Sequence, residues 1–204
     1  MLSPNPLSRI LTLGNLPCND DELGRSLMPT LRQMNEKDIA AVLQIQAENY
    51  VSSMVETETI VRCRLRDFPE TAWVAEDAHT VCGYLVAYPS RVGHVTSLAS
   101  GFETVDDADC LYLHDLAIAK RAKGQGMGRS LVQGAWDDAL ARGLRCSTLV
   151  SVQDSQRFWH ALGYVVSDEM PDAQRVKLMT YDSPAHYMVK NLARTRQRNA
   201  DLAT

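Results

Sequence analysis

The amino-acid sequence predicts a single α/β domain with a mixed, mostly antiparallel central sheet flanked by helices. The chain has 204 residues, of which 45% are hydrophobic and 23% charged, enough for one domain with its own core and too few for two large ones. Strand-like and helix-like patterns alternate along most of its length. Near the middle, an apolar strand, a glycine-rich turn and a helix follow one another, and this unit supplies the parallel part of the sheet.

The N-terminal segment, residues 1–29, contains four prolines and no sustained periodicity, so we expect a flexible or surface-draped arm. The pattern of a folded domain runs from residue 30 to residue 192. Residues 193–204 form a short tail, in which Arg194–Arg198 is a basic run typical of a solvated helix end.

The first elements of the domain are a short strand and two helices. Residues 31–34 alternate like a strand, and Asn35 and Asp38 have the spacing of a capping box before a helix over 36–50. A second helix is expected over about 56–66, because Pro69 ends the pattern. The apolar residues at helical spacing in the first helix are Ile39, Val42, Leu43 and Ala47.

Strand signals follow. Two apolar stretches, 72–75 and 81–88, flank a polar turn and predict a β-hairpin. A long connection rich in Ser, Gly and Asp covers 89–109, and long ordered loops are often functional. Residues 110–118 then form a strongly apolar predicted strand.

The second half of the domain begins with a helix that Gly143 is placed to close. A buried strand over 147–152 and a short helix over 155–162 come next. Three further strands are expected at 164–167, 175–181 and 186–192. One face of the first of these helices carries Leu131, Val132, Ala135, Trp136, Ala139 and Leu140.

Composition and charge exclude several classes of function. The net charge is −4 and the pI about 5.7, which gives no electrostatic footprint for nucleic acid. The five cysteines are odd in number and include no C-x-x-C pair, which favours reduced thiols over a zinc site or a disulfide framework. Because the sequence also shows no signal peptide and no apolar run of about 18 residues, we expect a soluble cytoplasmic protein without a membrane partner or a metal.

The sharpest signal is the segment Lys123-Gly124-Gln125-Gly126-Met127-Gly128-Arg129, where a strand runs into three alternate glycines and a helix begins at the last. Glycines let several main-chain N–H groups converge and let an anion approach the backbone closely. The helix N-terminus adds partial positive charge, and Lys123 and Arg129 add full charges. Such a turn suits a pyrophosphate.

The glycine spacing narrows the choice of ligand. G-x-G-x-G differs from the G-x-G-x-x-G of dinucleotide folds, and the Gly-Lys-Ser/Thr of a Walker loop does not occur. A nucleotide-binding oxidoreductase is therefore a distant alternative. On the glycines alone, a tight strand–helix turn without any ligand also stays open.

The turn resembles the cofactor motif of the GNAT superfamily of N-acetyltransferases, Gln/Arg-x-x-Gly-x-Gly/Ala, with Lys123 in the first position. An overlapping frame that begins at Arg121 also fits, but the first frame keeps the strand end and the helix start where the family has them. A second family motif, Ala-x-x-Phe-Tyr-x-x-x-Gly-Phe, resembles Ser155–Tyr164. The resemblance covers about residues 30–192 and implies a GNAT-like fold.

This resemblance implies acetyl-CoA as co-substrate. The main chain of Leu116–Ile118 would pair with the pantetheine arm, the N–H groups of residues 125–129 would bind the pyrophosphate, and an N–H near Ile118 would meet the thioester oxygen as it becomes an oxyanion. The residues expected to bind the co-substrate are Leu116, Ala117, Ile118, Lys123, Gly124, Gln125, Gly126, Met127, Gly128, Arg129, Ser155 and Phe158.

Two neighbouring residues are candidates for the base that an amine with a pKa of about 10.4 requires. His114 lies in Leu-His-Asp-Leu-Ala-Ile, which resembles the Leu-His-x-Leu-Ala-Val segment of the arylalkylamine N-acetyltransferases, where a histidine is the base or part of a proton wire. Asp115 is the alternative, since many family members carry an acidic residue here that acts through water. Strand alternation puts the two on opposite faces unless a bulge intervenes, and a purely structural His114 stays open.

Trp159 departs from the family pattern. The family's tyrosine at this position commonly protonates the leaving thiolate, whereas an indole N–H can only donate a hydrogen bond. A thiol with a pKa of about 8.5 can leave with such help alone, so Trp159 either stabilises the thiolate or packs in the core. Tyr112, Tyr164 and His160 are alternative proton donors.

The leading hypothesis is an enzyme that moves an acetyl group from acetyl-CoA to a primary amine of a small molecule or a protein, by direct attack. A non-catalytic acyl-CoA-binding or regulatory module is the alternative, because the tyrosine is missing. Four carboxylates could attract a cationic amine, although a solvated loop explains them better: Glu103, Asp106, Asp107 and Asp109. The fold does not name the amine, and the sequence is compatible with a homodimer.

Overall fold

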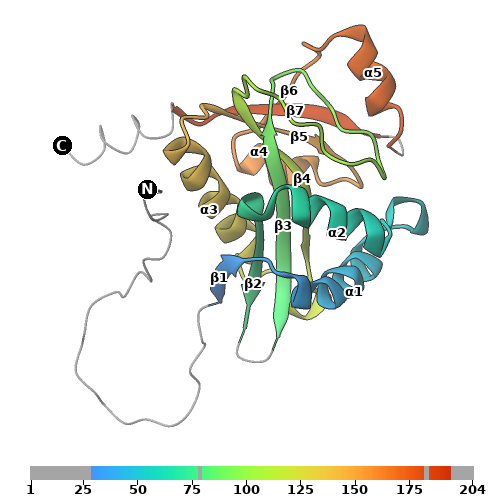
Figure 1. Cartoon of the computed structure of the whole chain (residues 1–204), viewed down its shortest axis with the longest axis vertical. Helices are drawn as coiled ribbons and strands as arrows, with labels where there is room; N and C mark the ends of the chain where they lie inside the picture. Colours follow the sequence, from blue (N-terminus) through green and yellow to red (C-terminus); the bar gives the residue numbers. More distant parts are fainter. Residues whose placement is uncertain (1–28, 78–79, 182–183, 194–204) are drawn as a thin grey trace, which may run out of the picture.

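The structure is a computed structural model that describes residues 29–77, 80–181 and 184–193, which build one seven-stranded sheet with helices on both faces (Figure 1). The expected arm up to residue 28 and the tail from residue 194 lie outside the described residues. The strands are β1 (Thr30–Gln33), β2 (Ala72–Glu76), β3 (Val81–Ser90), β4 (Cys110–Ile118), β5 (Cys146–Ser151), β6 (Val165–Val166) and β7 (His186–Asn191). The helices are α1 (Ile39–Asn49), α2 (Glu58–Asp67), α3 (Met127–Ala141), α4 (Gln156–Ala161) and α5 (Asp172–Leu178).

The strand order is β1-β2-β3-β4-β5-β7-β6, and the expected mixed, mostly antiparallel sheet is confirmed. Among the described strands, only β4 and β5 run parallel, with paired residues from Cys110–Cys146 to Leu113–Leu149. Beyond this short ladder, residues 115–118 of β4 pair with β3 alone, and residues 150–151 of β5 pair with β7 alone. The two strands therefore diverge, and one edge of β4 is left without a neighbouring strand.

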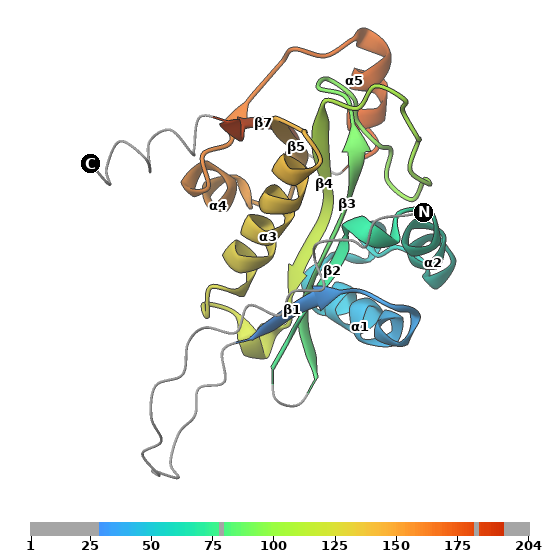
Figure 2. The same cartoon turned by 60° about the vertical axis from the view of Figure 1, so that its left-hand side comes forward.

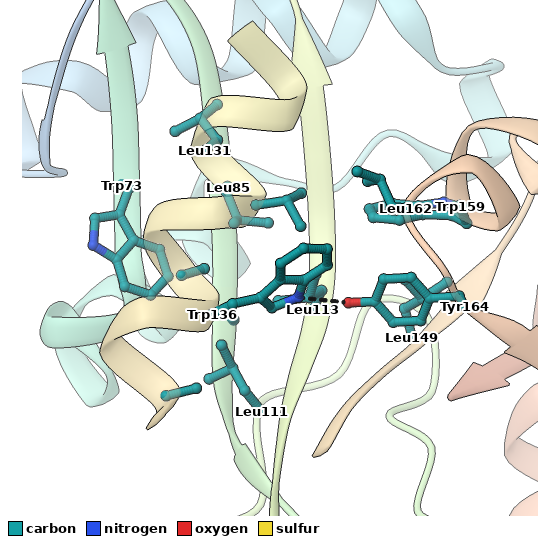
Figure 3. Packing of buried hydrophobic residues seen from close by; sticks show 14 of the residues in the cluster. Trp73, Leu85, Leu111, Leu113, Leu131, Trp136, Leu149, Trp159, Leu162 and Tyr164 are labelled. Atoms are coloured by element: carbon teal, nitrogen blue, oxygen red, sulfur yellow. Dashed lines mark hydrogen bonds between the residues drawn. The ribbon is translucent and has the colours of Figure 1, made fainter. Parts of the chain in front are cut away.

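Helices lie on both faces of the sheet (Figure 2), and two hydrophobic cores hold α1 to α4 against it. α1 and α2 cover one face, where Ile39, Val42 and Val61 pack with Val74 and Tyr84. α3 and α4 cover the other face (Figure 3). This second core includes Leu85, Leu111, Leu113, Leu131, Trp136, Leu149, Trp159, Leu162 and Tyr164.

The capping box predicted before α1 and the glycine predicted to end α3 are both present in the structure. The capping box is present before a 3₁₀ turn that leads into α1: the Asn35 side chain accepts from the N–H of Lys37 at 3.0 Å, and the N–H of Asn35 donates to Asp38 at 2.8 Å. Gly143 ends α3 with a φ of 85°, a left-handed conformation that glycine adopts without a steric penalty. These residues fix where α1 starts and where α3 stops.

The other predicted elements are confirmed with small shifts of their ends, except one. Residues 175–181 do not form a strand: they belong to α5 and the turn after it. Pro171 and Asp172 provide a helix start, and the long side chains that follow are good helix formers. α5 is held by the connection between β3 and β4, since Gln174 accepts from the N–H of Val95 at 3.0 Å.

Candidate active site

A cleft of about 660 Å³ opens where β4 and β5 diverge. It is lined by β4, by the glycine turn with the first turn of α3, by the end of β5 with α4, and by Asn49 and Tyr50 at the end of α1. Every residue predicted to bind the co-substrate lines this cleft except Gln125, whose exposed side chain donates to the carbonyl of Arg121 at 3.4 Å. The predicted binding residues are thus brought together in space.

The glycine turn offers unpaired main-chain donors to the cleft. Gly124 and Gly126 both have a φ of 80°, which side-chain-bearing residues adopt at a cost. Within the described residues, no N–H group from Gly124 to Arg129 donates to an acceptor. A row of free N–H groups at a helix N-terminus is an anion-binding arrangement, so the turn fits a pyrophosphate.

The free edge of β4 fits an extended ligand. Leu116, Ala117 and Ile118 line the cleft and have no strand neighbour on the β5 side. Asn49 takes one acceptor at the end of this edge, because its side chain donates to the carbonyl of Ile118 at 3.0 Å. The carbonyl of Leu116 accepts from the hydroxyl of Tyr50 at 3.3 Å, so the N–H groups of this edge are the ones left for a chain that pairs with β4 as an added strand would.

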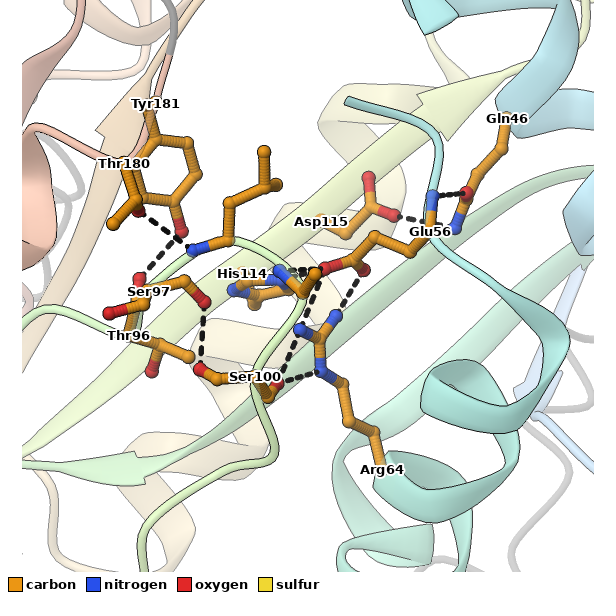
Figure 4. A network of polar contacts seen from close by, with 12 residues as sticks. Gln46, Glu56, Arg64, Thr96, Ser97, Ser100, His114, Asp115, Thr180 and Tyr181 are labelled. Atoms are coloured by element: carbon orange, nitrogen blue, oxygen red, sulfur yellow. Dashed lines mark hydrogen bonds and ion pairs between the residues drawn. The ribbon is translucent and has the colours of Figure 1, made fainter. Parts of the chain in front are cut away.

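A β-bulge decides how His114 and Asp115 are oriented. Asp115 pairs with Val86 and Leu113 pairs with Ala87, so His114 is an extra residue in β4. The bulge cancels the alternation of the strand. Both side chains therefore point to the face covered by α1 and α2, and both residues line the cleft (Figure 4).

His114 is buried among aromatic and charged groups. Its side chain is 3% exposed, and its Nε2 lies 3.5 Å from Oε1 of Glu56. Its Nδ1 is buried without a hydrogen-bond partner in the described part of the chain. Burial and the nearby charge of Arg64 lower the pKa of His114, so the imidazole is held neutral.

Asp115 is fully engaged by hydrogen-bond donors. Its carboxylate accepts from the hydroxyl of Tyr50 at 2.5 Å, from the hydroxyl of Tyr84 at 2.6 Å and from the amide of Gln46 at 3.4 Å. Burial raises the pKa of Asp115. Burial and the Asp115 carboxylate also raise the pKa of both tyrosines, so these hydroxyls stay protonated and keep donating.

Trp159 packs in the hydrophobic core and also lines the cleft. Its side chain packs edge-on against Tyr164 with ring centroids 5.5 Å apart, and the residue also lines the cleft. None of the three alternative proton donors lines the cleft. The hydroxyl of Tyr164 is turned into the core, where it meets Trp136 at 3.1 Å and Ser147 at 2.7 Å (Figure 3).

The four acidic residues before β4 lie on the surface rather than in the cleft. Glu103 forms an ion pair with Lys177 at 2.8 Å, Asp107 forms one with Arg91, and Asp109 accepts from the N–H of Val92 at 2.8 Å. In the described ranges, no group of three His, Cys, Asp or Glu side chains is arranged to hold a metal ion. No helix in those ranges is long and apolar enough to span a membrane.

Several residues around His114 were not predicted from the sequence. Gln46 and Asn49 continue the buried stripe of Ile39 and Val42 along α1. Polar residues at these core-facing positions of the helix could have indicated that they lie at a site. Glu56 and Arg64 gave no such signal, because charged residues on an amphipathic helix normally face solvent.

The fold, the divergent strands and the glycine turn define an acyl-CoA-dependent N-acyltransferase. The chain belongs to the acetyltransferase (GNAT) family, whose model matches residues 39–164. The match spans β4, the glycine turn and the segment that ends at Tyr164, so the family resemblance seen in the sequence is confirmed. No curated protein matches the chain in sequence.

Solved structures share this fold at low sequence identity. Ard1 from Thermoplasma volcanium has a TM-score of 0.63 and 18% identity, over 81% of this chain and 98% of that chain. The ribosomal-protein-S18-alanine N-acetyltransferase from Escherichia coli has a TM-score of 0.58 and 14% identity, over 81% and 94%. The loading GNATL domain of CurA from Lyngbya majuscula has a TM-score of 0.65 and 11% identity, over 81% and 98%.

Proposed function

We propose that the enzyme transfers an acetyl group from acetyl-CoA to a primary amine by direct attack in a ternary complex, with His114 as the general base. One observation carries this proposal: a single cleft joins a row of free main-chain N–H groups to a buried imidazole whose Nδ1 has no partner. The first feature suits the pyrophosphate, and the second suits proton removal from the amine.

The co-substrate would lie along the cleft in an extended form. The N–H groups of residues 125–129 would bind its pyrophosphate, with Lys123 and Arg129 adding charge. The free edge of β4 at Leu116–Ile118 would pair with the pantetheine arm. This arrangement brings the thioester to the part of β4 next to the bulge.

The chemical step then needs few protein groups. The amine nitrogen attacks the thioester carbonyl carbon, the C–N bond forms, the C–S bond breaks, and the proton of the amine goes to Nδ1 of His114, directly or through one water. A main-chain N–H near Ile118 would stabilise the developing oxyanion. The thiol of coenzyme A has a thiol-like pKa of about 8.5, so its thiolate can leave while Trp159 lines its pocket without donating a proton.

Asp115 has a different proposed role. Both of its oxygens accept from tyrosine hydroxyls, so it holds Tyr50 and Tyr84 in place rather than taking the substrate proton. Tyr50 lines the cleft, and its position therefore depends on Asp115. We expect Asp115→Asn to lower kcat/KM less than the loss of His114 does.

For the acceptor we propose only a broad class of amine. The solved structures that share the fold include a ribosomal-protein-S18-alanine N-acetyltransferase and an N-acetylglutamate synthase, so a protein amine and a small molecule both fit. We place the enzyme in the cytoplasm, because the four cysteines in the described ranges are all unpaired. We also propose that residues 30–192 are the whole catalytic domain.

The first experiment is a thermal shift with acetyl-CoA, coenzyme A and NAD in parallel. A ligand at about a hundred times its dissociation constant stabilises by roughly 2.7 kcal/mol, which is a rise on the order of 5 °C for a domain of this size. We expect a rise with the two coenzyme A species only. No rise with saturating acetyl-CoA would remove the basis of the proposal.

The second experiment measures thiol release from acetyl-CoA with a panel of peptide and small-molecule amines. We expect His114→Gln to lower kcat/KM by about 10²- to 10⁴-fold, the usual contribution of a general base, with the thermal shift preserved. The exposed residue His160 lies outside the cleft, so His160→Gln is the control and should be silent. Coenzyme A binding without turnover on any amine would favour the non-catalytic alternative.

A further inference from the structure

A buried ion pair lies directly behind His114, and neither the glycine turn nor the free edge of β4 explains it. Arg64 of α2 is 3% exposed, and Glu56, just before α2, is 5% exposed. Their side chains meet in a fork, with Nη2 of Arg64 donating to Oε1 of Glu56 at 2.7 Å and Nη1 donating to Oε2 (Figure 4). Burying two charges costs free energy, and a hydrophobic pair of the same size often stabilises as well. The pair therefore suggests a function beyond stability.

Arg64 and Glu56 also form hydrogen bonds with main-chain groups outside the pair. Arg64 donates to the carbonyl of Ser100 from Nε at 3.1 Å and from Nη2 at 2.6 Å. The N–H of Ala99 donates to Oε1 of Glu56 at 3.1 Å. The pair thus ties α2 to the connection between β3 and β4, and this connection in turn places the ring of Phe102 edge-on against His114 at 5.1 Å. The imidazole cannot rotate freely in this setting.

The contact between Glu56 and His114 favours one tautomer of the imidazole. An ionised carboxylate only accepts hydrogen bonds, and the pKa of Glu56 is about 2, because contacts with His114 and Arg64 outweigh the rise that burial alone would cause. The nitrogen that faces Glu56 is Nε2, at 3.5 Å. A proton on Nε2 leaves the lone pair on Nδ1, which is the nitrogen without a partner in the described part of the chain.

We propose that Glu56 and Arg64 are positioning residues for His114: Glu56 holds the tautomer with its proton on Nε2, and Arg64 offsets the carboxylate so that the imidazole stays neutral and ready to accept a proton. This inference rests on the proposed function of His114 as the base. It adds that Arg64 of α2 and Glu56, just before this helix, set the protonation state of the base. A carboxylate alone beside a histidine would favour the imidazolium form, which cannot accept a proton.

The other charged and titratable groups around His114 agree with this division of roles. From α2, Arg64 lowers the pKa of His114, in the same direction as burial. From the segment before α2 and from β4, Glu56 and Asp115 act in the opposite direction. Tyr112 of β4 and Tyr181 after α5 stay neutral, because burial raises the pKa of both hydroxyls.

The experiment is nitrogen-15 NMR of the full chain with labelled histidine, followed by a pH titration. The His114 signals are assigned by their loss in His114→Gln. We expect the neutral tautomer with the proton on Nε2 at pH 7. A proton on Nδ1, or an imidazolium at that pH, would overturn the proposal. This readout needs no turnover, so it separates this inference from a failure of the proposed function.

Two variants test the tuning in opposite directions. Arg64→Met removes the positive charge and should raise the pKa of His114, whereas Glu56→Gln removes the negative charge and should lower it, each on the order of one unit. The acidic limb of the kcat/KM profile should move with them. Arg62→Met on the same helix is the control, because Arg62 is 46% exposed and pairs with Glu58 at the surface.

A purely structural pair would weaken folding and activity in both variants without opposite shifts, and that result would refute the tuning. If either variant fails to fold, as judged by circular dichroism and melting, the tautomer in the unmodified protein still decides the role of Glu56. The other variant then decides the direction of the shift.

Discussion

Two glycines of similar backbone geometry lie at the two ends of α3. Gly126 at its start has a φ of 80° and Gly143 after its end has a φ of 85°, and a Cβ at either position would meet no atom within 4 Å. Replacing either by alanine therefore costs backbone strain alone, roughly 1 to 2 kcal/mol. The two positions differ in function, because only Gly126 belongs to the row of free N–H groups.

We expect Gly126→Ala and Gly143→Ala to lower the free energy of unfolding by similar amounts, about 1 to 2 kcal/mol each. Only Gly126→Ala should also weaken coenzyme A binding, by about tenfold or more, since the turn must shift to relieve the strain. Denaturant titration gives the first quantity and isothermal titration calorimetry the second. Equal affinities in the two variants would argue against a pyrophosphate at this turn.

At the residue scale, the sequence located most of the cleft. Alternate glycines and flanking cations are local features, so Lys123 and Gly126 could be assigned from the chain alone. The bulge at His114 could not, because it arises from the register between β3 and β4, and register depends on residues far apart in sequence. The buried Arg64 was missed for another reason, because a charged residue on an amphipathic helix normally faces solvent.

At the element scale, α5 shows how a pattern can favour the wrong structure. Val176, Leu178 and Thr180 alternate with polar or flexible residues, which is typical of a strand. In the structure Val176 is 67% and Met179 82% exposed, whereas Leu178 packs against the aromatic cluster around Tyr88. A single short alternation cannot be distinguished from a helix with one buried face.

A matched pair of truncations tests this element. Leu178→Ala should lower the free energy of unfolding by about 1 to 2 kcal/mol, because it removes partly buried apolar surface. Met179→Ala should change it by less than about 0.5 kcal/mol, because the side chain is exposed. Denaturant titration of both variants is sufficient. Equal losses would contradict the helical packing of α5.

At the scale of the whole molecule, buried titratable groups predict how stability depends on pH. The pKa of His114 lies below its ordinary value of 6.5, so its contribution is present above pH 6.5 and is lost as the pH falls below it. The pKa of Glu56 is about 2 against an ordinary 4.5, so its contribution is lost between pH 4.5 and 2. Asp115 has a raised pKa and acts in the opposite direction.

We therefore expect the free energy of unfolding to fall on acidification below pH 6.5, with a slope of up to about 1.4 kcal/mol per pH unit for the proton of His114. In His114→Gln this part of the slope should disappear, while His160→Gln should keep it. Urea titrations between pH 5 and 7 provide the measurement. A slope unchanged in His114→Gln would mean that this imidazole is not held neutral in the native state.

The sequence also predicted the fold at this scale, for a physical reason. Most strands and helices carry their own periodic pattern, and the strand–turn–helix unit around Gly126 fixes the parallel connection between β4 and β5. The family membership of the chain follows from the same unit. What the sequence could not give is the surroundings of the base, which combine α1, α2 and the connection after β3.

The divergence of β4 from β5 has a consequence for motion. β1 to β4 form one hydrogen-bonded block and β5, β7 and β6 form another, and in the described strands the strand pairing between the two blocks is limited to the short ladder from Cys110–Cys146 to Leu113–Leu149. We expect this ladder to act as a hinge between the two blocks, which then move as plates, with α3 packed against both. A molecule seated along β4 and against α4 would brace the plates at their open end, so amide hydrogen exchange should slow on both sides of the hinge when coenzyme A binds.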